Sequence, residues 1–301
     1  MTKSGYVAIL GLPNAGKSTL MNTLLGQKLS IVTPKPQTTR KRILGILSSE
    51  NYQVIFLDTP GIIKPEYLLQ KKMMEAVNDS LKDADIVILI VDVSYDPGKQ
   101  NIIKNEFINN NLLKITKPLL LVLNKVDLSE QEKVKSLIVK YESLKKFKKV
   151  IPISALLNFN IEDVLNTIIE LLPEGPKYYP DDIVAEENER FFVSEIVREK
   201  IFELYKEEIP YSTEVVVSDF KEREANKDYI LAEIIVEKES QKGIIIGKQG
   251  AAIKNLGFEA RKAIEDFLQK EVYLELRVKV KSKWRSDEKQ LKSFGYIKPK
   301  D

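Results

Sequence analysis

Residues 11–19 read GLPNAGKST and directly follow the apolar run YVAIL at residues 6–10. Two glycines with four residues between them, followed by Lys and Ser, are the pattern of a phosphate-binding loop between a strand and a helix. The glycines let backbone N–H groups point at phosphate oxygens, and the positive end of the following helix faces the same oxygens. The stretch therefore predicts an α/β domain that binds a nucleotide. The expected contacts are Gly11, Leu12, Pro13, Asn14, Ala15, Gly16, Lys17, Ser18 and Thr19.

The composition restricts the chemistry available to such a site. The 301 residues contain no Cys and no His, which excludes disulfides, thiolate nucleophiles and imidazole bases. The apolar runs have the length of strands rather than of membrane spans, and the N-terminus lacks the pattern of a signal peptide. We therefore expect a cytoplasmic protein whose chemistry depends on carboxylates, hydroxyls, lysines, backbone dipoles and bound ions.

The net charge of +3 is unevenly distributed along the chain. Residues 241–301 hold 15 Lys and Arg against 8 Asp and Glu, whereas residues 1–240 hold 32 against 36. Such an asymmetry favours a polyanionic partner for the C-terminal part. A solvated basic surface without a partner is the alternative, and charge alone does not separate the two.

Strand-like apolar runs alternate with helical patterns from residue 6 to about residue 172. Runs with little internal alternation, each followed by a helix, indicate a mostly parallel sheet with helices on both faces. RKRILGILSSENYQVIFLD at residues 40–58 interrupts this order, because two runs around a polar SSEN predict an antiparallel hairpin at one edge. The longer helices are expected at about 66–82, 99–111, 130–146 and 160–172.

A second domain is expected after PEGPKYYPDD at residues 173–182, where Pro, Gly and charged residues concentrate. Beyond this stretch the expected order is a helix at about 189–208, two strands, a short helix, a long helix at 251–269 and a final strand. This order predicts an α+β domain. The predicted boundaries are 1–174 for the first domain, 175–188 for the linker, 189–283 for the second domain and 284–301 for a basic C-terminal tail.

DTPG at residues 58–61 follows the strand QVIFL and is expected to form a loop beside the bound metal ion. Asp58 is expected to hold Mg²⁺ through water, with the Ser18 hydroxyl as a second ligand, while Lys17 reaches the β- and γ-phosphates. The N–H of Gly61 is expected to contact the γ-phosphate, so that hydrolysis releases the loop. Thr59 and Pro60 belong to the same predicted contact set.

Two later motifs select the base. NKVD at residues 124–127 is expected to present the Asp127 carboxylate to two hydrogen-bond donors of guanine. Adenine lacks these donors on that edge, so an adenine complex would leave the carboxylate unpaired, which is strongly unfavourable. Asn124 is expected at the other edge of the purine, and backbone N–H groups around Ala155 in SAL at the O6 atom. Each motif alone is compatible with an ordinary turn after a strand, but the ordered set predicts GTP. The expected base contacts are Asn124, Lys125, Asp127, Ser154, Ala155 and Leu156.

This set resembles a translation-factor-type GTPase domain. The resemblance implies that LSIVTPKPQTTRKR at residues 29–42 is a mobile first switch loop, in which a threonine closes over Mg²⁺ in the triphosphate state. Thr39 is preferred to Thr38 because it directly precedes the basic run at 40–42. The expected metal ligands are therefore Ser18, Thr39 and Asp58.

The residue after DTPG is Ile62, where many GTPases have a glutamine that orients the attacking water. Isoleucine offers no hydrogen bond, so we expect slow intrinsic turnover assisted by backbone groups, a cation or a partner. Asn14 suggests K⁺, since related GTPases with Asn at this place use it as a K⁺ ligand; an ordinary role as a turn former is the alternative. The residues expected to act in hydrolysis are Lys17, Asn14, Thr39 and Gly61.

A second glycine loop, GKQG at residues 247–250, differs from the first because only two residues separate its glycines and no Lys-Ser follows. IIIGKQGAAIKNLGFEARKAIEDF resembles a KH domain of the second type, in which such a loop clamps the backbone of single-stranded nucleic acid beside an apolar groove for the bases. A plain turn between two helices is the alternative. Trp284 and Tyr273 either stack on bases or fill core and surface. The expected RNA contacts are Lys242, Ile246, Gly247, Lys248, Gln249, Gly250, Lys254 and Arg261, with Lys262 nearby.

Along its whole length, with GLPNAGKST, QTTR, DTPG, NKVD, SAL and IIGKQG in order, the chain resembles the bacterial Era GTPases. The resemblance implies a monomer that binds the 3′ end of small-subunit ribosomal RNA and assists maturation of the small ribosomal subunit. It also implies peripheral association with the inner membrane. Two functions stay open: a hydrolase whose GTP cycle times RNA release, or an RNA chaperone whose pocket is a slow GTP sensor.

Overall fold

The computed structural model describes residues 2–94, 102, 105–223 and 226–297. Its contacts divide the chain into two compact units. Unit 1 comprises residues 1–30, 39–64 and 73–186, and unit 2 comprises residues 31–38, 65–72 and 187–301. Among the described residues, no helix is both long and apolar enough to cross a membrane.

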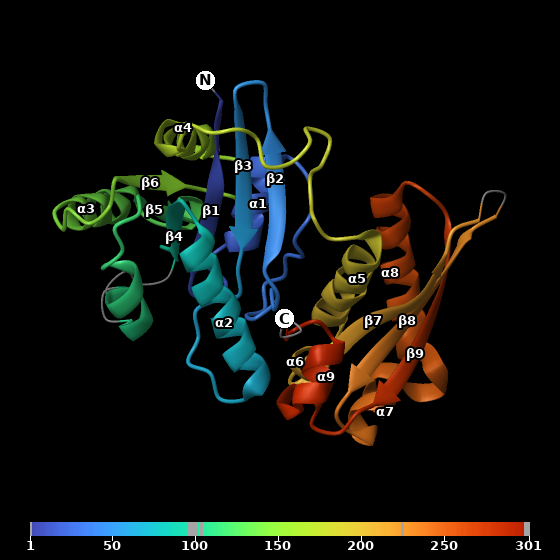
Figure 1. The fold of residues 1–301 in the computed structure, drawn as a ribbon. Helices are drawn as coiled ribbons and strands as arrows, with labels where there is room; N and C mark the ends of the chain where they lie inside the picture. Colours follow the sequence, from blue (N-terminus) through green and yellow to red (C-terminus); the bar gives the residue numbers. More distant parts are fainter. Residues whose placement is uncertain (1, 95–101, 103–104, 224–225, 298–301) are drawn as a thin grey trace. The chain divides into compact units, whose positions relative to one another are not determined.

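Unit 1 is built on a six-stranded sheet in the order β2-β3-β1-β4-β5-β6 (Figure 1). Only β2 is antiparallel, and it pairs with β3 across the SSEN turn, so the predicted edge hairpin is confirmed. The central strand is buried on both faces, since Val7, Ala8, Ile9 and Leu10 are all fully inaccessible. The strands are β1 (Lys3–Gly11), β2 (Ile43–Ser48), β3 (Tyr52–Asp58), β4 (Ile86–Asp92), β5 (Leu119–Asn124) and β6 (Lys149–Ile153).

Helices cover both faces of this sheet, with α1 behind it and α2 in front of it in Figure 1. The helices are α1 (Lys17–Leu25), α2 (Leu68–Asp83), α3 (Gln131–Glu142) and α4 (Ile161–Leu171). Of the helix expected at 99–111, residues 99–101 and 103–104 lie outside the described residues, and a π-helical turn, η2 (Ile108–Leu112), is present at its end. The carboxyl ends of β1, β3 and β5 lead directly into GLPNAGKST, DTPG and NKVD, which is why these motifs converge.

Unit 2 has the element order expected for its C-terminal part, α-β-β-α-α-β. Its sheet has the order β7-β8-β9, with β7 and β8 antiparallel and β8 and β9 parallel. Helices α5 and α8 pack on one face, where Ile230, Ala232 and Ile234 of β8 are buried with Leu256, Ala260 and Ile264 of α8. The elements are α5 (Glu189–Leu204), α6 (Ile209–Ser212), β7 (Glu214–Lys221), β8 (Asp228–Val236), α7 (Glu239–Ile246), η4 (Lys248–Gly250), α8 (Ala251–Leu268) and β9 (Val272–Val280).

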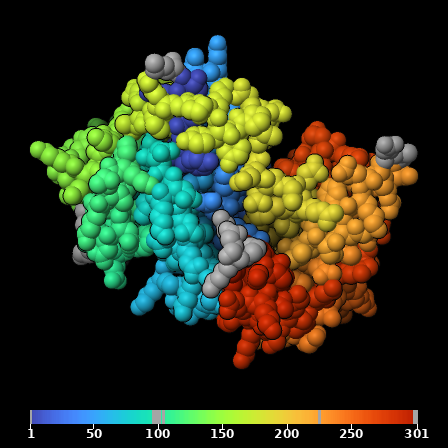
Figure 2. Space-filling model, viewed as in Figure 1, coloured from blue at the N-terminus to red at the C-terminus, as the bar shows by residue number. Residues whose placement is uncertain are grey.

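The segment expected as a basic tail differs from that expectation. It forms a 3₁₀ turn, η5 (Trp284–Ser286), and a helix, α9 (Glu288–Ser293), whose red atoms gather in a compact mass in Figure 2. The Trp284 ring is fully buried, packs edge-on against Phe294, and its indole N–H donates to the Ser212 carbonyl at 2.9 Å. The hypothesis that Trp284 stacks on bases is therefore wrong. An indole that has both a core and a hydrogen-bond partner is a packing residue.

Residues 31–38, from the loop predicted as mobile, are held inside unit 2. The Val32 N–H donates to the Glu199 carboxylate at 3.0 Å. The Lys35 ammonium donates to the carbonyls of Phe202 and Tyr205 at the C-terminal end of α5, where a helix accumulates partial negative charge. This part of the predicted switch loop thus has defined partners on α5.

Candidate nucleotide site and nucleic-acid interface

The phosphate loop joins β1 to α1 as predicted. Gly16 takes φ +97°, and a Cβ there would lie 2.2 Å from the Asn124 amide nitrogen, so only glycine fits. The Lys17 side chain is buried, and its ammonium donates to the backbone carbonyl of Leu12 at 3.0 Å. Burial lowers the pKa of Lys17 to about 8, with the nearby Asp58 carboxylate acting in the opposite direction. A desolvated ammonium under this loop is placed to gain strongly from an anionic phosphate.

The three expected metal ligands lie together. The Ser18 hydroxyl donates to Asp58 Oδ2 at 2.7 Å and lies 2.9 Å from Thr39 Oγ1. Thr38 instead hydrogen-bonds to Thr33 at 2.9 Å, so the geometry favours Thr39 at this cluster. Asp58 is fully buried, and its Oδ1 has no hydrogen-bond partner.

These residues fit Mg²⁺. Burial raises the pKa of Asp58, opposed by the hydrogen bond from Ser18 and the charge of Lys17. A buried carboxylate oxygen without a partner is costly unless a cation or donor approaches it. Two hydroxyls and one carboxylate, with phosphates and waters completing the shell, are the oxygen donors that Mg²⁺ requires.

The DTPG loop is locked onto the phosphate loop. A Cβ on Gly61 would lie 2.9 Å from the backbone of Pro13, so the two loops touch at this glycine. Ile62 is buried, and its N–H donates to the Gly11 carbonyl at 3.0 Å. Thr59, which was expected to contact nucleotide, donates its hydroxyl to the Ile9 carbonyl at 2.8 Å inside the core. Ile62 thus anchors the loop by apolar burial and a backbone bond, a role that the sequence did not predict.

Asn124 of NKVD makes two hydrogen bonds to other loops that the sequence analysis did not predict. The Asn124 amide donates to the Ala15 carbonyl at 2.9 Å and accepts from the Ala155 N–H at 3.0 Å. Asn124 therefore ties the phosphate loop to the SAL loop. The Ala155 N–H, one of the backbone groups expected near guanine O6, hydrogen-bonds to Asn124, and the contact of this group of N–H donors with O6 stays a prediction. The contact of Asn124 with the purine stays a prediction. No short motif signals this bridge, because its partners are 109 and 31 residues away.

The other expected base contacts differ in exposure, and Ser154 is buried. Asp127 is exposed in η3 (Val126–Leu128), and Leu156 is 81% exposed. Lys125 takes φ +66°, and its ammonium is 2.5 Å from Asp92 at the end of β4. Asp92 was missed by the sequence analysis, although its place at the end of a central parallel strand marks it as a candidate. It orients the lysine expected along the guanine plane.

The GKQG loop lies at the surface of unit 2. Gly247 and Gly250 have positive φ values of +72° and +77°, and a Cβ on Gly247 would lie 2.6 Å from that of Ala252. Lys248 and Gln249 between them are exposed. The sharp turn thus presents two side chains and adjacent backbone to solvent, as a backbone clamp requires.

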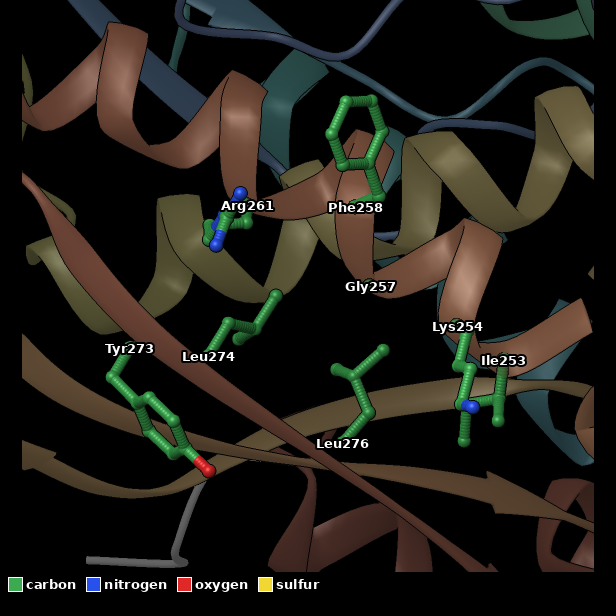
Figure 3. Close-up of a pocket in the computed structure, with 8 residues that line it drawn as sticks. All are labelled: Ile253, Lys254, Gly257, Phe258, Arg261, Tyr273, Leu274 and Leu276. Atoms are coloured by element: carbon green, nitrogen blue, oxygen red, sulfur yellow. The ribbon is translucent and has the colours of Figure 1, made fainter. Parts of the chain in front are cut away.

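The basic residues near this loop differ from those on the sheet in their ion pairing. Figure 3 shows two of the residues near the loop, Lys254 and Arg261, which lie on α8. Lys221, Lys270, Arg277 and Lys279 on or beside the strands pair with Asp219, Asp228, Glu275 and Glu233. Within the described part of the chain, no ion pair involves the basic residues around GKQG, which are Lys242, Lys248, Lys254, Arg261 and Lys262. Their charge is therefore available to a polyanion.

The two units define a class: a P-loop GTPase with a C-terminal KH domain. A family model described as 50S ribosome-binding GTPase matches residues 6–125, and a KH domain model matches residues 208–285. The chain is 52% identical to the chloroplastic GTPase ERA1 of Zea mays over 295 residues, which are 98% of this chain and 70% of the maize protein. It is 45% identical to GTPase Era of Clostridium botulinum strain Okra, over 100% of both chains. The chain belongs to the Era family of GTPases.

A solved structure extends this likeness to the fold. It is the crystal structure of Era in complex with MgGDPNP and nucleotides 1506–1542 of 16S ribosomal RNA. The match has a TM-score of 0.92 at 40% identity and covers 98% of this chain and 99% of that one.

Proposed function

We propose that this GTPase binds the 3′ end of small-subunit ribosomal RNA through its KH domain and assists maturation of the small ribosomal subunit. The full-length match to Era bound to MgGDPNP and nucleotides 1506–1542 of 16S ribosomal RNA carries the proposal. The exposed GKQG turn supports it from this chain's own residues, as do the surrounding cations, which form no ion pair with any residue that the structure describes.

The nucleotide chemistry is assigned to unit 1. Ser18, Thr39 and Asp58 would hold Mg²⁺, which supplies charge neutralisation for the β- and γ-phosphates. Lys17 binds the same phosphates, and the DTPG loop senses the γ-phosphate through Gly61. Hydrolysis without a glutamine after DTPG is slow, on the order of 10⁻³ s⁻¹ or below. Asn14, exposed with φ +61°, is the proposed ligand of an assisting K⁺.

The cellular setting is part of the same proposal and is supported by the family resemblance alone. We place the protein in the cytoplasm as a monomer, with peripheral association at the inner membrane.

Charge reversal at the tip of the GKQG loop tests RNA binding. In Lys248→Glu/Gln249→Glu, both replaced side chains are exposed, so the fold should persist while two carboxylates repel the phosphate backbone. We expect affinity for an RNA of nucleotides 1506–1542, measured by fluorescence anisotropy, to fall at least about 30-fold, with a shallower salt dependence.

The matched control is Lys279→Ala on β9, whose ammonium pairs with Glu233 at 2.6 Å. It should leave RNA affinity within about twofold, because an ion-paired lysine contributes little to polyanion binding. Equal losses in both variants, or none in the first, would remove GKQG from the RNA site.

A further inference from the structure

The Ser30 hydroxyl is a buried polar group that none of the expected nucleotide contacts uses. Ser30 is fully inaccessible to solvent. Among the residues that the structure describes, its Oγ atom has no hydrogen-bond partner. A buried hydroxyl without a partner is unfavourable, because the group loses its hydrogen bonds to water and gains none in return. Such a group needs an explanation, and a bound ion or water is one.

Asn22 on α1 fixes the place of Ser30. The Asn22 amide donates to the Ser30 carbonyl at 2.7 Å, and its oxygen accepts from the Ser30 N–H at 2.9 Å. The same oxygen accepts from the Leu29 N–H at 3.0 Å. The backbone at residues 29–30 is thus held against α1, and the Ser30 hydroxyl takes no part in this contact.

The same helix brings Ser30 to the expected metal ligands. Asn22 lies four residues after Ser18, so the two side chains lie on one face of α1, one turn apart. Ser18 donates to Asp58 Oδ2 at 2.7 Å, and Oδ1 of this buried carboxylate has no partner among the described residues. Burial raises the pKa of the Asp58 carboxyl, and the Ser30 hydroxyl is one of the groups that act in the opposite direction. Ser30 and Asp58 are therefore neighbours, and each has an oxygen that lacks a hydrogen bond.

Ser4 shows that burial alone does not define such a site. Its hydroxyl is also buried and without a partner in the described part of the chain. Ser4 lies near the start of β1, however, and the phosphate loop begins at the other end of this strand, roughly 20 Å away. Ser30 differs from Ser4 because it lies beside a second unsatisfied oxygen, on a carboxylate expected to bind a metal through water.

We propose that Ser30 is a positioning residue of the metal site: its hydroxyl and Asp58 Oδ1 both accept from one water molecule through which Asp58 binds Mg²⁺. The inference rests on the proposed Mg²⁺ site and adds a residue that was not expected to act there. Mg²⁺ keeps several of its waters in proteins, and acceptors in the outer shell fix their orientation. Because Asn22 on α1 holds Ser30, the contact serves the diphosphate and triphosphate states alike.

Ser30→Ala in the full-length protein tests the proposal. Mg²⁺ is titrated against the protein bound to a fluorescent GDP, whose rate of release reports on occupancy of the metal site. We expect the Mg²⁺ concentration that half-maximally slows release to rise about tenfold, as for the loss of an outer-shell partner. A non-hydrolysable GTP analogue should show the same rise. GDP affinity measured in EDTA, without metal, should be unchanged.

Stability separates this role from a structural one. Removing a hydroxyl that has no partner leaves no other group unsatisfied, so Ser30→Ala without metal and nucleotide should unfold no more easily than the wild type. Ser4→Ala is the matched control, because it removes the same kind of group at the far end of β1. It should behave alike in denaturant and leave Mg²⁺ affinity unchanged.

The contrary outcomes are distinct. Unchanged Mg²⁺ affinity in Ser30→Ala, or an equal loss in Ser4→Ala, would overturn the inference and leave the metal site intact. A Ser30→Ala protein that is destabilised without metal would have the same consequence, because the hydroxyl would then be a structural group. A wild-type protein whose GDP release does not respond to Mg²⁺ would overturn the proposed metal site, and this inference with it.

Discussion

At the scale of single residues, the candidate nucleotide site requires glycine at two positions where other residues approach the backbone closely. Gly16 leaves room for the Asn124 amide, and Gly61 leaves room for the Pro13 backbone. Ser18, Thr39 and Asp58 converge although 40 residues separate the first from the last. The site is therefore set by close approach of backbones as much as by the side chains that bear charge.

Gly61→Ala tests whether contact between the DTPG loop and the phosphate loop transmits the state of the γ-phosphate. The added methyl would lie 2.9 Å from Pro13, so the loop must move away, at a cost of about 1–3 kcal/mol in unfolding free energy. We expect affinity for a GTP analogue to fall about tenfold more than affinity for GDP, because the proposed contact of the Gly61 N–H is with the γ-phosphate, which GDP lacks. Nucleotide titrations followed by fluorescence measure both affinities.

Gly175→Ala is the control for this substitution, since a Cβ there meets nothing within 4 Å. It should change neither affinity. Equal losses for GTP analogue and GDP in Gly61→Ala would argue against a sensor role for this loop.

At the scale of elements, local sequence patterns predicted the strands and the long helices. They did not predict the structure of the C-terminal segment. Its charged residues indicated a tail, yet α9 is amphipathic enough to bury Leu291 completely, and Trp284 and Phe294 pack edge-to-face. Tyr296 further donates its hydroxyl to the Glu214 carboxylate at 2.7 Å. In so short a helix, a few apolar residues among lysines are hard to distinguish from a solvated tail.

Leu291→Ala tests whether α9 is part of the core of unit 2. Removing a fully buried leucine should lower the free energy of unfolding by about 2–5 kcal/mol. Trp284 is the only tryptophan of the chain, so its fluorescence during denaturant unfolding reports on unit 2 alone. The exposed neighbour gives the control, Lys292→Ala, which should stay within about 0.5 kcal/mol of the wild type. A dispensable tail would give the same midpoint for both variants.

At the scale of the whole molecule, the two glycine loops belong to different units and are expected to bind different phosphates. The loop in unit 1 has a buried lysine, and its Ser18 lies beside Thr39 and Asp58, the other two expected metal ligands. The loop in unit 2 is exposed and its lysine is not buried. Residues 31–38 belong to unit 2 through α5, and Thr39 directly after them belongs to unit 1. The expected metal ligand Thr39 therefore directly follows, along the chain, a segment of the unit that carries the expected RNA contacts.

GTP turnover measured with K⁺ and with Na⁺, each with and without the 3′ RNA, separates a timing hydrolase from a slow sensor. We expect turnover on the order of 10⁻³ s⁻¹ or below for the free protein, faster in K⁺ than in Na⁺, because Ile62 is buried and offers no group to orient water. Asn14→Ala should abolish the difference between the two cations and leave the Na⁺ rate unchanged. Free protein that turns over as fast as ribosome-bound protein would exclude the sensor.

The sequence by itself determined the class of fold, the order of the nucleotide motifs and the absence of thiol or imidazole chemistry. These properties follow from requirements that a few adjacent residues meet. Glycine occurs where φ is positive, and an apolar run occurs where both faces of a strand are covered. Only the tertiary structure decided that Thr39 rather than Thr38 joins Ser18 and Asp58, that Asn124 ties two loops together and that Trp284 is buried. It also showed which cations form no ion pair among the described residues. These facts depend on contacts between residues far apart in the chain, whose partners no local pattern specifies.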